Sequence, residues 1–343
     1  MPRQTFFGRF KQSRTFLLIV LTIVILLILL LVSGPQVFNE GNALQIMNKM
    51  AYMGIFITAT ACLLLSGGID FSLGAQATFG CILFAEFCIN NPNTPWIVFA
   101  ILALVLGAVM GLINAFFSQV LNLMPFICTI GISSVWLGIA NWYSKALVKT
   151  INNPSFSMVA AAKIPGTPIP LTFLFMILLV VIYAMVIKRT NFGRSVLVVG
   201  GNPAAARLAG LNPKRVKSVL YVNASILGMI GGLIYTAQLK SAGTSGIPQA
   251  MVEMNGLTAS LLGGVSFAGG AGGLAGAFFG ILLIQVLAYS MQIMVNYVWL
   301  VQFVNGMLLV VALTIDTITT SRRMKKLGLK AGGGGMVMPG MAR

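Results

Sequence analysis

The stretch TFLLIVLTIVILLILLLVS, residues 15–33, contains nineteen positions without a charged side chain. A helix needs about 20 apolar residues to cross the hydrocarbon layer of a bilayer, so this stretch predicts one membrane-spanning helix. Further charge-free runs follow, the longest being the 62 residues from Met254 to Ile315. These runs do not alternate apolar with polar residues, as the strands of a membrane β-barrel would. The chain is therefore predicted to be an all-α polytopic membrane protein.

Composition supports the same class. Hydrophobic residues make up 58% of the 343 positions and charged residues 8%, whereas a soluble domain carries about 25% charge. Of the 22 Lys and Arg, seventeen lie in three clusters: before Thr15, from Lys188 to Lys217, and after Thr320. Such clusters are typical of the cytoplasmic segments of a membrane protein. The net charge of +17 therefore does not indicate nucleic-acid binding.

Ten crossings are predicted, because an even number keeps both basic termini and the 188–217 loop on the cytoplasmic side. Segment 15–33 follows a basic start, but it is too long for a signal peptide and lacks a small-x-small exit, so we expect it to be retained. The eighth segment contains Gly256, Gly263 and Gly264, and a re-entrant half-span is an open alternative there. The predicted spans are residues 15–33, 43–66, 72–89, 96–120, 124–144, 170–187, 217–239, 249–266, 273–291 and 297–316.

The predicted domain organisation follows from these spans. Residues 1–14 form a basic cytoplasmic N-terminus, and residues 15–320 form the membrane domain, which includes the cytoplasmic loop 188–217. Residues 321–343 form a basic cytoplasmic tail, whose four consecutive glycines predict disorder.

Residues that could carry chemistry are scarce. The chain has no histidine, and its four cysteines are scattered in apolar surroundings, so neither a metal site nor a redox pair is predicted. No G-x-x-x-x-G-K-S/T sequence is present, so we do not expect the chain to hydrolyse ATP itself. Gly270–Ala275 fits G-x-G-x-x-G/A, but that pattern is meaningful only between a strand and a helix. An enzyme would need paired acid–base groups, which five acids without histidine do not supply.

An internal repeat joins two distant segments. LSGGIDFSLGA at residues 65–75 (the first copy) aligns without gaps on LLGGVSFAGGA at residues 261–271 (the second copy), with six of eleven positions identical. Glycine-broken apolar segments at matching places are typical of duplicated transporters with discontinuous helices; chance similarity is the alternative. A full eighth crossing makes the copies parallel, and a re-entrant one makes them inverted. The predicted helix-break or gate residues are Gly67, Gly68, Asp70, Ser72, Gly74, Gly263 and Gly264.

Asp70 lies inside the first copy, in a chain with only five acidic residues. Burial of an ionisable side chain in a membrane is energetically costly. Such a residue therefore lies either at the membrane edge or in a functional site. The helix that follows begins with unpaired backbone N–H groups, and a carboxylate or the Ser72 hydroxyl can accept them. Capping is the favoured interpretation, and contact with a substrate or gate is the alternative.

The segment 190–217 differs from the apolar sequence around it. Asn202 and Pro203 are typical of a helix start, alanine-rich sequence follows, and Gly210 is typical of a helix end. A helix of about two turns is not stable alone in water. It therefore needs a surface to dock on, which is either a protein partner or the lipid headgroups.

Four motifs follow one another along the chain: GGIDFSLG (67–74), MPFICTIG (124–131), FGRSVLVVGGNPAAARLAGLN (192–212) and LLGGVSFAGGAGGLAGAFFG (261–280). In this order and spacing they resemble the ribose-type permease family, the membrane subunits of bacterial ATP-binding-cassette (ABC) importers for simple sugars. The similarity runs from about residue 40 to 320. One departure is Glu253-Met254-Asn255, where the family usually has Glu-Leu-Asp, so this chain lacks the second acid.

The resemblance implies a permease that translocates a simple sugar by alternating access across the bacterial cytoplasmic (inner) membrane. It implies a second permease subunit, two cytoplasmic ATPase subunits or one fused tandem ATPase that bind ATP and Mg, and an external sugar-binding protein. The chain itself would need no cofactor. A nucleoside permease, a branched-chain amino-acid permease and an ion-coupled secondary carrier are the alternatives. The implied coupling helix, which docks on the ATPase, comprises Asn202, Pro203, Ala205, Ala206, Arg207, Leu208 and Gly210.

Weak contacts with the cargo are expected along the pathway, because an importer must release what it carries. Candidates are polar or aromatic side chains within the spans, although such residues more often serve helix packing. They are Gln76, Asn114, Phe126, Thr129, Glu253 and Asn255.

Overall fold

A computed structural model of the chain describes residues 14–35, 39–249, 251–294 and 298–326. Except for Arg14, the predicted N-terminal segment lies outside the described residues, and so does the glycine-rich tail beyond Lys326.

Long helices dominate the described part of the chain, and nine of them there are long and apolar enough to cross a membrane. The predicted all-α polytopic class is therefore confirmed. These long helices are α2 (Arg14–Ser33), α3 (Glu40–Leu65), α4 (Leu73–Asn90), α5 (Trp96–Ala115, continued by the π-helix η2, Phe116–Val120), α6 (Pro125–Ser144), α8 (Leu171–Arg189), α11 (Pro213–Leu239), α14 (Leu274–Met294) and α15 (Val298–Lys326). The shorter elements are β1 (Lys149–Thr150), α7 (Pro154–Ala161), α9 (Asn191–Gly201), α10 (Pro203–Leu208), β2 (Ser241–Ala242), α12 (Gly246–Gln249) and α13 (Val252–Leu262).

The eighth predicted span, 249–266, is not one continuous helix but is broken between α12 and α13. Helix α13 has 11 residues, a length of about 16 Å, roughly half the ~30 Å hydrocarbon layer. Met251, just before it, has a left-handed backbone with φ +48°, which separates α13 from α12. Residues 255–261 of α13 are all buried. A broken helix is tolerated there because neighbouring protein, and not lipid, surrounds it.

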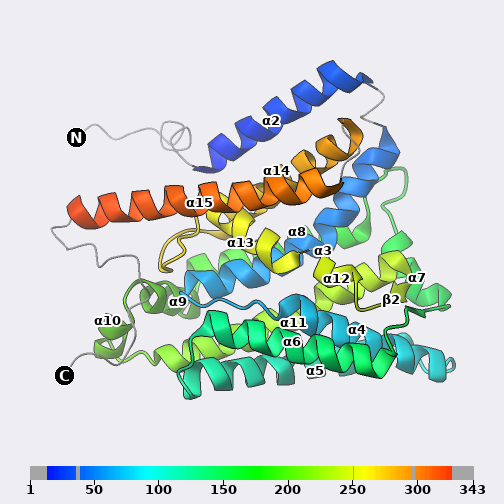
Figure 1. Cartoon of the computed structure of the whole chain (residues 1–343), viewed down its shortest axis with the longest axis horizontal. Helices are drawn as coiled ribbons and strands as arrows, with labels where there is room; N and C mark the ends of the chain where they lie inside the picture. The colour runs from blue at the N-terminus through cyan, green and yellow to red at the C-terminus, as the bar shows by residue number, and fades with distance from the viewer. Residues whose placement is uncertain (1–13, 36–38, 250, 295–297, 327–343) are drawn as a thin grey trace.

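The long helices lie side by side, with α9 and α10 at one end of the bundle and α7 and β2 at the opposite end (Figure 1). Helix α3 is central, since every residue from Met50 to Leu65 is buried and it packs against α8, α11, α13 and α14. Helices α2, α6 and α15 lie at the periphery and leave most of their side chains exposed. The break between α3 and α4 is buried or half-buried throughout, whereas the break between α13 and α14 is partly exposed, for example at Phe267.

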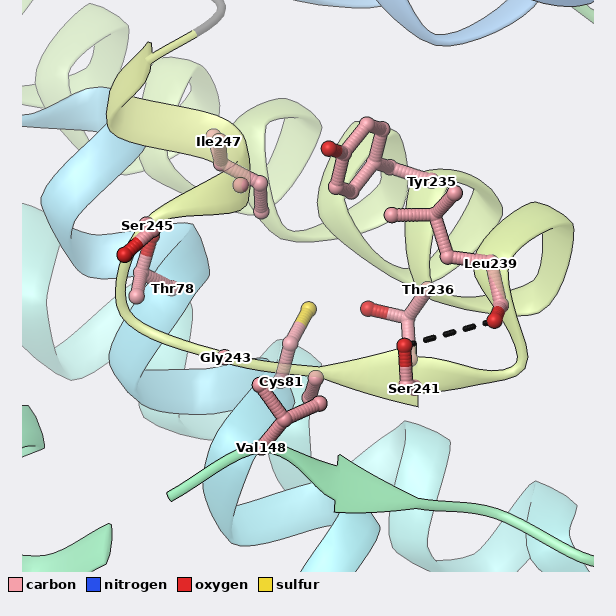
Figure 2. Close-up of a pocket in the computed structure, with 12 residues that line it drawn as sticks. Thr78, Cys81, Val148, Tyr235, Thr236, Leu239, Ser241, Gly243, Ser245 and Ile247 are labelled. Carbon is pink, nitrogen blue, oxygen red and sulfur yellow. Dashed lines mark hydrogen bonds between the residues drawn. The ribbon is translucent and has the colours of Figure 1, made fainter. Parts of the chain in front are cut away.

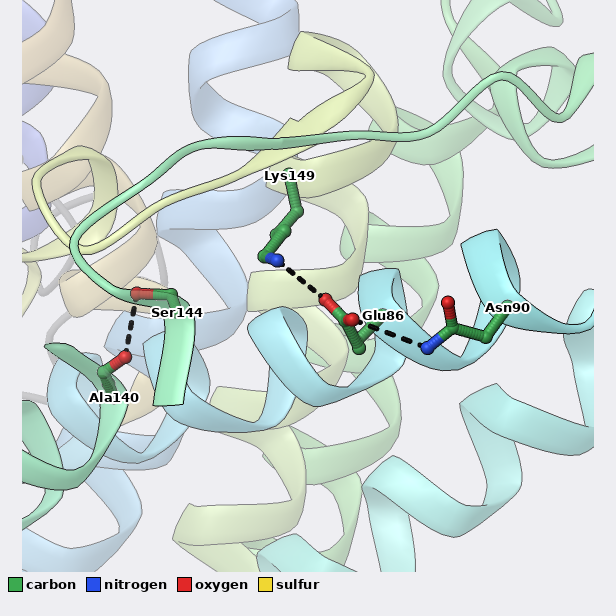
Figure 3. Close-up of polar contacts among 5 residues, drawn as sticks. All are labelled: Glu86, Asn90, Ala140, Ser144 and Lys149. Atoms are coloured by element: carbon green, nitrogen blue, oxygen red, sulfur yellow. Dashed lines mark hydrogen bonds and ion pairs between the residues drawn. The ribbon is translucent and has the colours of Figure 1, made fainter. Parts of the chain in front are cut away.

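The end that carries α7 and β2 is held by contacts between loops (Figure 3). Lys149 of β1 pairs with Ala242 of β2, and its Nζ lies 2.9 Å from Oε2 of Glu86 in α4. The Asn90 side chain donates to the other Glu86 oxygen at 3.2 Å. Phe156 of α7 packs against aromatic rings of α4 and α5. None of these short elements was predicted from the sequence.

The two copies of the internal repeat occupy equivalent places. The first copy follows α3 and leads into α4, and the second follows α13 and leads into α14. Gly256 in α13 lies against Thr60 in α3. Further along both segments, Gly269 lies against Gly67. Because α13 runs beside the last turns of α3 in the same direction, the copies are parallel, as a crossing eighth segment predicts.

Candidate functional site at the helix breaks and the α9–α10 segment

The first break, residues 66–72, is organised around the carboxylate of Asp70. Its Oδ1 accepts hydrogen bonds from the Ser72 backbone N–H at 2.8 Å and the Ser72 hydroxyl at 2.6 Å. Its Oδ2 accepts one from Asn114 Nδ2, at the end of α5, at 2.8 Å. Asp70 is only 3% exposed, so these donors replace water around it. A buried carboxylate with this many donors holds the turn before α4 in place.

The cap of α4 comes from elsewhere, and in this detail the sequence prediction was wrong. Ser72 is the N-cap residue, but its side chain makes no capping hydrogen bond. The Gly74 N–H, in the first turn of α4, donates instead to Glu253 Oε1 at 2.6 Å. Glu253 belongs to α13 and lies 179 positions further along the chain. The first helix break is therefore stabilised by a carboxylate from the second half of the protein.

The second break, residues 263–273, also rests on a carboxylate. Asp316 of α15 accepts the Phe267 N–H at 3.0 Å, and the Ser266 hydroxyl lies 3.4 Å from the same oxygen. Ser266 occupies the position of Asp70 in the repeat. The second copy lacks an acid of its own, and the neighbouring helix supplies one.

Glycines allow the chain to turn at both breaks. Gly67 has φ +71° and Gly264 has φ +88°, a left-handed conformation that residues with a side chain rarely adopt. A Cβ on Gly276 of α14 would lie 1.9 Å from the carbonyl oxygen of Gly263, so the backbones of α13 and α14 touch there. The predicted residues Gly68, Ser72 and Gly74 also lie within the first break or the first turn after it. Their role as a gate stays a prediction.

Three of the predicted pathway residues lie in the interior around Asp70. Gln76 Nε2 donates to the Ser72 hydroxyl at 2.9 Å, and Thr129 Oγ1 accepts the Phe71 N–H at 3.1 Å. With Asn114 they are all 0–1% exposed. In this conformation they support the break and face no open surface.

The other three predicted pathway residues are dispersed. Glu253 caps α4, and Asn255 Oδ1 accepts a hydrogen bond from Asn305 of α15 at 3.2 Å. Phe126 alone of the six is largely exposed, at 42%, and it packs edge-on against the ring of Phe71.

Helix α6 carries a polar face that the sequence analysis missed. It is mostly exposed, like α2, but it is less hydrophobic than α2. Its exposed positions include small and polar residues at helical spacing, which places them on one face. This α6 face comprises Gly131, Ser134, Gly138 and Asn141.

Helix α10 forms as predicted, with Asn202 as its N-cap. Asn202 Oδ1 accepts the backbone N–H groups of Ala204 and Ala205, both at 3.0 Å. The chain leaves the helix through Gly210 at φ +79°. Helix α9, which precedes α10, was not predicted. Its Val196 and Val199 side chains are fully buried.

The faces of α10 differ from the prediction in one residue. Ala206 is 0% exposed, so it anchors α10 to the body of the protein and cannot contact a docked partner. Leu208, in contrast, is 93% exposed. Beside α10 lies a hollow of about 590 Å³, lined by residues that include Asn122, Arg207 and Lys214. This end of the bundle thus presents the almost fully exposed Leu208 side chain next to a cationic hollow.

A smaller hollow of about 120 Å³ lies at the opposite end, beneath β2 (Figure 2). Two of its hydroxyl groups already have acceptors: Thr78 donates to a carbonyl of its own helix, and Ser241 donates to Leu239 O. Among the described residues, no three His, Cys, Asp or Glu side chains lie close enough to hold a metal ion. These features offer no site as well defined as the breaks and α10.

Comparison with known proteins identifies the family to which this chain belongs. A family model described as branched-chain amino acid transport system / permease component matches residues 42–313. The chain belongs to this permease family. Among relatives of the permease, the probable ABC transporter permease YphD of Escherichia coli is 29% identical over 90% of this chain and 91% of its own length.

Two further relatives have names that state a cargo. The ribose import permease RbsC of Bacillus subtilis is 29% identical over 83% of this chain and 87% of its own. The galactose/methyl galactoside import permease MglC of Haemophilus influenzae is 26% identical over 92% of this chain and 97% of its own length. No solved structure matches the chain. The resemblance to ribose-type permeases is confirmed, and the permease is a multi-pass protein of the bacterial inner membrane.

Substitution of Asp70 separates its structural role from a role of its charge. Asp70→Leu leaves the Ser72 N–H and an Asn114 amide hydrogen without an acceptor, and each loss costs about 1–3 kcal/mol. We expect a lower melting temperature and a several-fold lower yield of folded permease in detergent. Asp70→Asn keeps an oxygen for both Ser72 donors and loses only the bond from Asn114, so its yield should lie between those of Asp70→Leu and the wild type, with uptake per folded permease retained. Loss of uptake by Asp70→Asn at normal yield, or normal yield of Asp70→Leu, would contradict the structural role.

Proposed function

We propose that this permease is the membrane-spanning subunit of an ATP-driven importer for a simple sugar. An external binding protein delivers the sugar, and partner ATPase subunits move it. The observation that carries the proposal is α10, an N-capped helix of 6 residues at one end of the bundle, with Leu208 93% exposed. So short a helix gains little stability by itself, and a bare leucine on it suits a groove in another protein.

The α9–α10 end is assigned to the cytoplasm. Lys188 and Arg189 end α8 there, and Arg207 and Lys214 flank the hollow beside α10. Basic residues accumulate on the cytoplasmic side of membrane proteins. The cationic hollow also suits acidic side chains on a docked ATPase subunit. The end with α7 and β2 then faces the external binding protein.

A simple sugar is the favoured cargo because relatives that match nearly the whole chain have names of sugar permeases, including those for ribose and galactose. A branched-chain amino acid is the second candidate, which the description of the family favours.

The α6 face is assigned to a second permease subunit and to the translocation pathway between the two subunits. Ser134 and Asn141 donate to carbonyl oxygens of their own helix, but exposed polar side chains are still less favourable against lipid tails than apolar ones, so we assign this face to protein or water. A Cβ added at Gly131 or Gly138 would meet nothing within 4 Å. The single chain therefore leaves space along this face, and the cargo would pass there with weak contacts.

Docking of α10 is tested by Leu208→Arg, which places a charge where the proposal needs an apolar contact. Residues at the centre of an interface contribute about 2 kcal/mol or more, so co-purification of the ATPase subunits should fall at least tenfold. ATP hydrolysis stimulated by loaded binding protein should fall with it, at normal yield of the permease. The control is Met158→Arg, on the exposed side of α7 at the other end (65% exposed), which should retain the ATPase. Full association of Leu208→Arg would leave α10 as a headgroup anchor and remove the main support for the proposal.

The assignment of the α6 face is tested by Gly138→Leu. The single chain has space for the larger side chain, so the yield of folded protein should not change. Because the leucine would enter the proposed interface and pathway, uptake should fall severalfold. Val105→Phe, on an exposed position of α5 (55%), is the control that should only face lipid and preserve uptake. Normal uptake by Gly138→Leu would show that the α6 face lies outside the pathway.

A further inference from the structure

Three backbone segments meet at the α9–α10 end with no side chain between them. They are the end of α3, the end of α9 and the second break. The Gly270 N–H donates to Leu65 O at 2.8 Å, which joins the second break to α3. A Cβ on Gly200, near the end of α9, would lie 2.0 Å from the same Leu65 oxygen and 2.5 Å from Gly270 N. We call this meeting point, formed by Leu65, Gly67, Gly200, Gly269 and Gly270, the glycine junction.

The glycine junction depends on the absence of side chains. Real Cβ atoms essentially never approach other atoms closer than 3.0 Å, and a Cβ on Gly269 would lie 2.6 Å from Gly67 N. Gly269 and Gly270 both have positive φ, +86° and +73°. Backbones in direct contact cannot relax by changing side-chain rotamers, and close-packed interiors transmit displacement. A shift of one segment must therefore move the other two or break their contacts.

The position of Gly200 in the chain connects the junction to α10. Gly200 and Gly201 are the last residues of α9, and Asn202, the N-cap of α10, follows directly. Only Gly201 thus separates the N-cap of α10 from the residue that contacts Leu65 and Gly270. Both breaks contact the junction, because Leu65 ends α3 just before the first break and Gly270 lies inside the second break.

We propose that the glycine junction transmits the displacement of α10 to both helix breaks at once, with Gly200 as its positioning residue. This inference rests on the proposed function, since it specifies how the docked ATPase would act on the pathway. A shift of α10 moves Gly200 against Leu65 O and Gly270 N. The first break, with Asp70, and the second break, with its Asp316 contact, then rearrange together.

The neighbouring glycine provides a matched control. A Cβ on Gly201 would lie 3.8 Å from Gly270 Cα, an ordinary contact distance. Gly200→Ala and Gly201→Ala therefore make the same chemical change in the same helix, one position apart. Only the Cβ of the first would overlap atoms of the junction.

The experiment uses the complete importer, reconstituted with its ATPase subunits and loaded binding protein. Gly200→Ala should keep its ATPase subunits, because α10 itself is unchanged. Sugar taken up per ATP hydrolysed should fall at least about fivefold, the lower end of typical coupling between sites. Gly201→Ala should match the wild type. Wild-type uptake per ATP by Gly200→Ala overturns the inference and leaves the proposed function standing. Failure of the wild type and Gly201→Ala to bind an ATPase or transport would instead overturn the proposed function.

If Gly200→Ala does not fold, a second measurement on the wild type tests whether the glycine junction transmits displacement. Hydrogen–deuterium exchange is compared in the full complex with and without a non-hydrolysable ATP analogue. Protection should change together in residues 62–68, 198–206 and 264–272. A change confined to 198–206, with both break segments unaffected, would overturn the inference.

Discussion

Every helix broken within a membrane leaves backbone N–H groups that lipid cannot accept, at a cost of several kcal/mol each. This permease meets that constraint with carboxylates. Asp70, Glu253 and Asp316 each accept a backbone N–H beside a break, and these are three of only five acidic residues in the chain. Each break is therefore stabilised by specific hydrogen bonds in this conformation. Glu253 and Asp316 come from distant segments, and Glu253 joins the second half of the protein to the first break.

The same arrangement gives the interior a direct connection to the end where α10 lies. Helix α3 and the second break are joined through Leu65 and Gly270, and α9 touches both through Gly200. Helix α10 follows α9 immediately and exposes Leu208 almost completely. An outside force applied to α10 thus has a short route, made of backbone contacts, to the segments that Asp70 and Asp316 hold. The α6 face, which we assign to a second subunit and to cargo, belongs to a helix that contacts the first break through Thr129.

Features coded by local sequence could be predicted well. The apolar run predicted at 124–144 is α6, at Pro125–Ser144, and Asn202 caps α10 because capping depends on a few adjacent residues. Features that depend on distant contacts could not. Apolar periodicity does not distinguish the 11 residues of α13 from a full span, and nothing near Gly74 indicates that Glu253 is its acceptor. Ala206 and Ala205 are the same residue type, and only the packing of α10 on the body shows which of them is buried.

The central claim is that ATP hydrolysis by a docked subunit, and not an ion gradient, drives this permease. The most direct test measures uptake of radiolabelled ribose, galactose or fructose by proteoliposomes that contain the permease and its ATPase subunits, with loaded binding protein outside and ATP inside. The account predicts uptake that requires ATP and the binding protein, stops when the ATPase is inactivated, and continues when ionophores collapse proton and sodium gradients. Uptake by the permease without ATPase subunits, abolished by the ionophores, would contradict it.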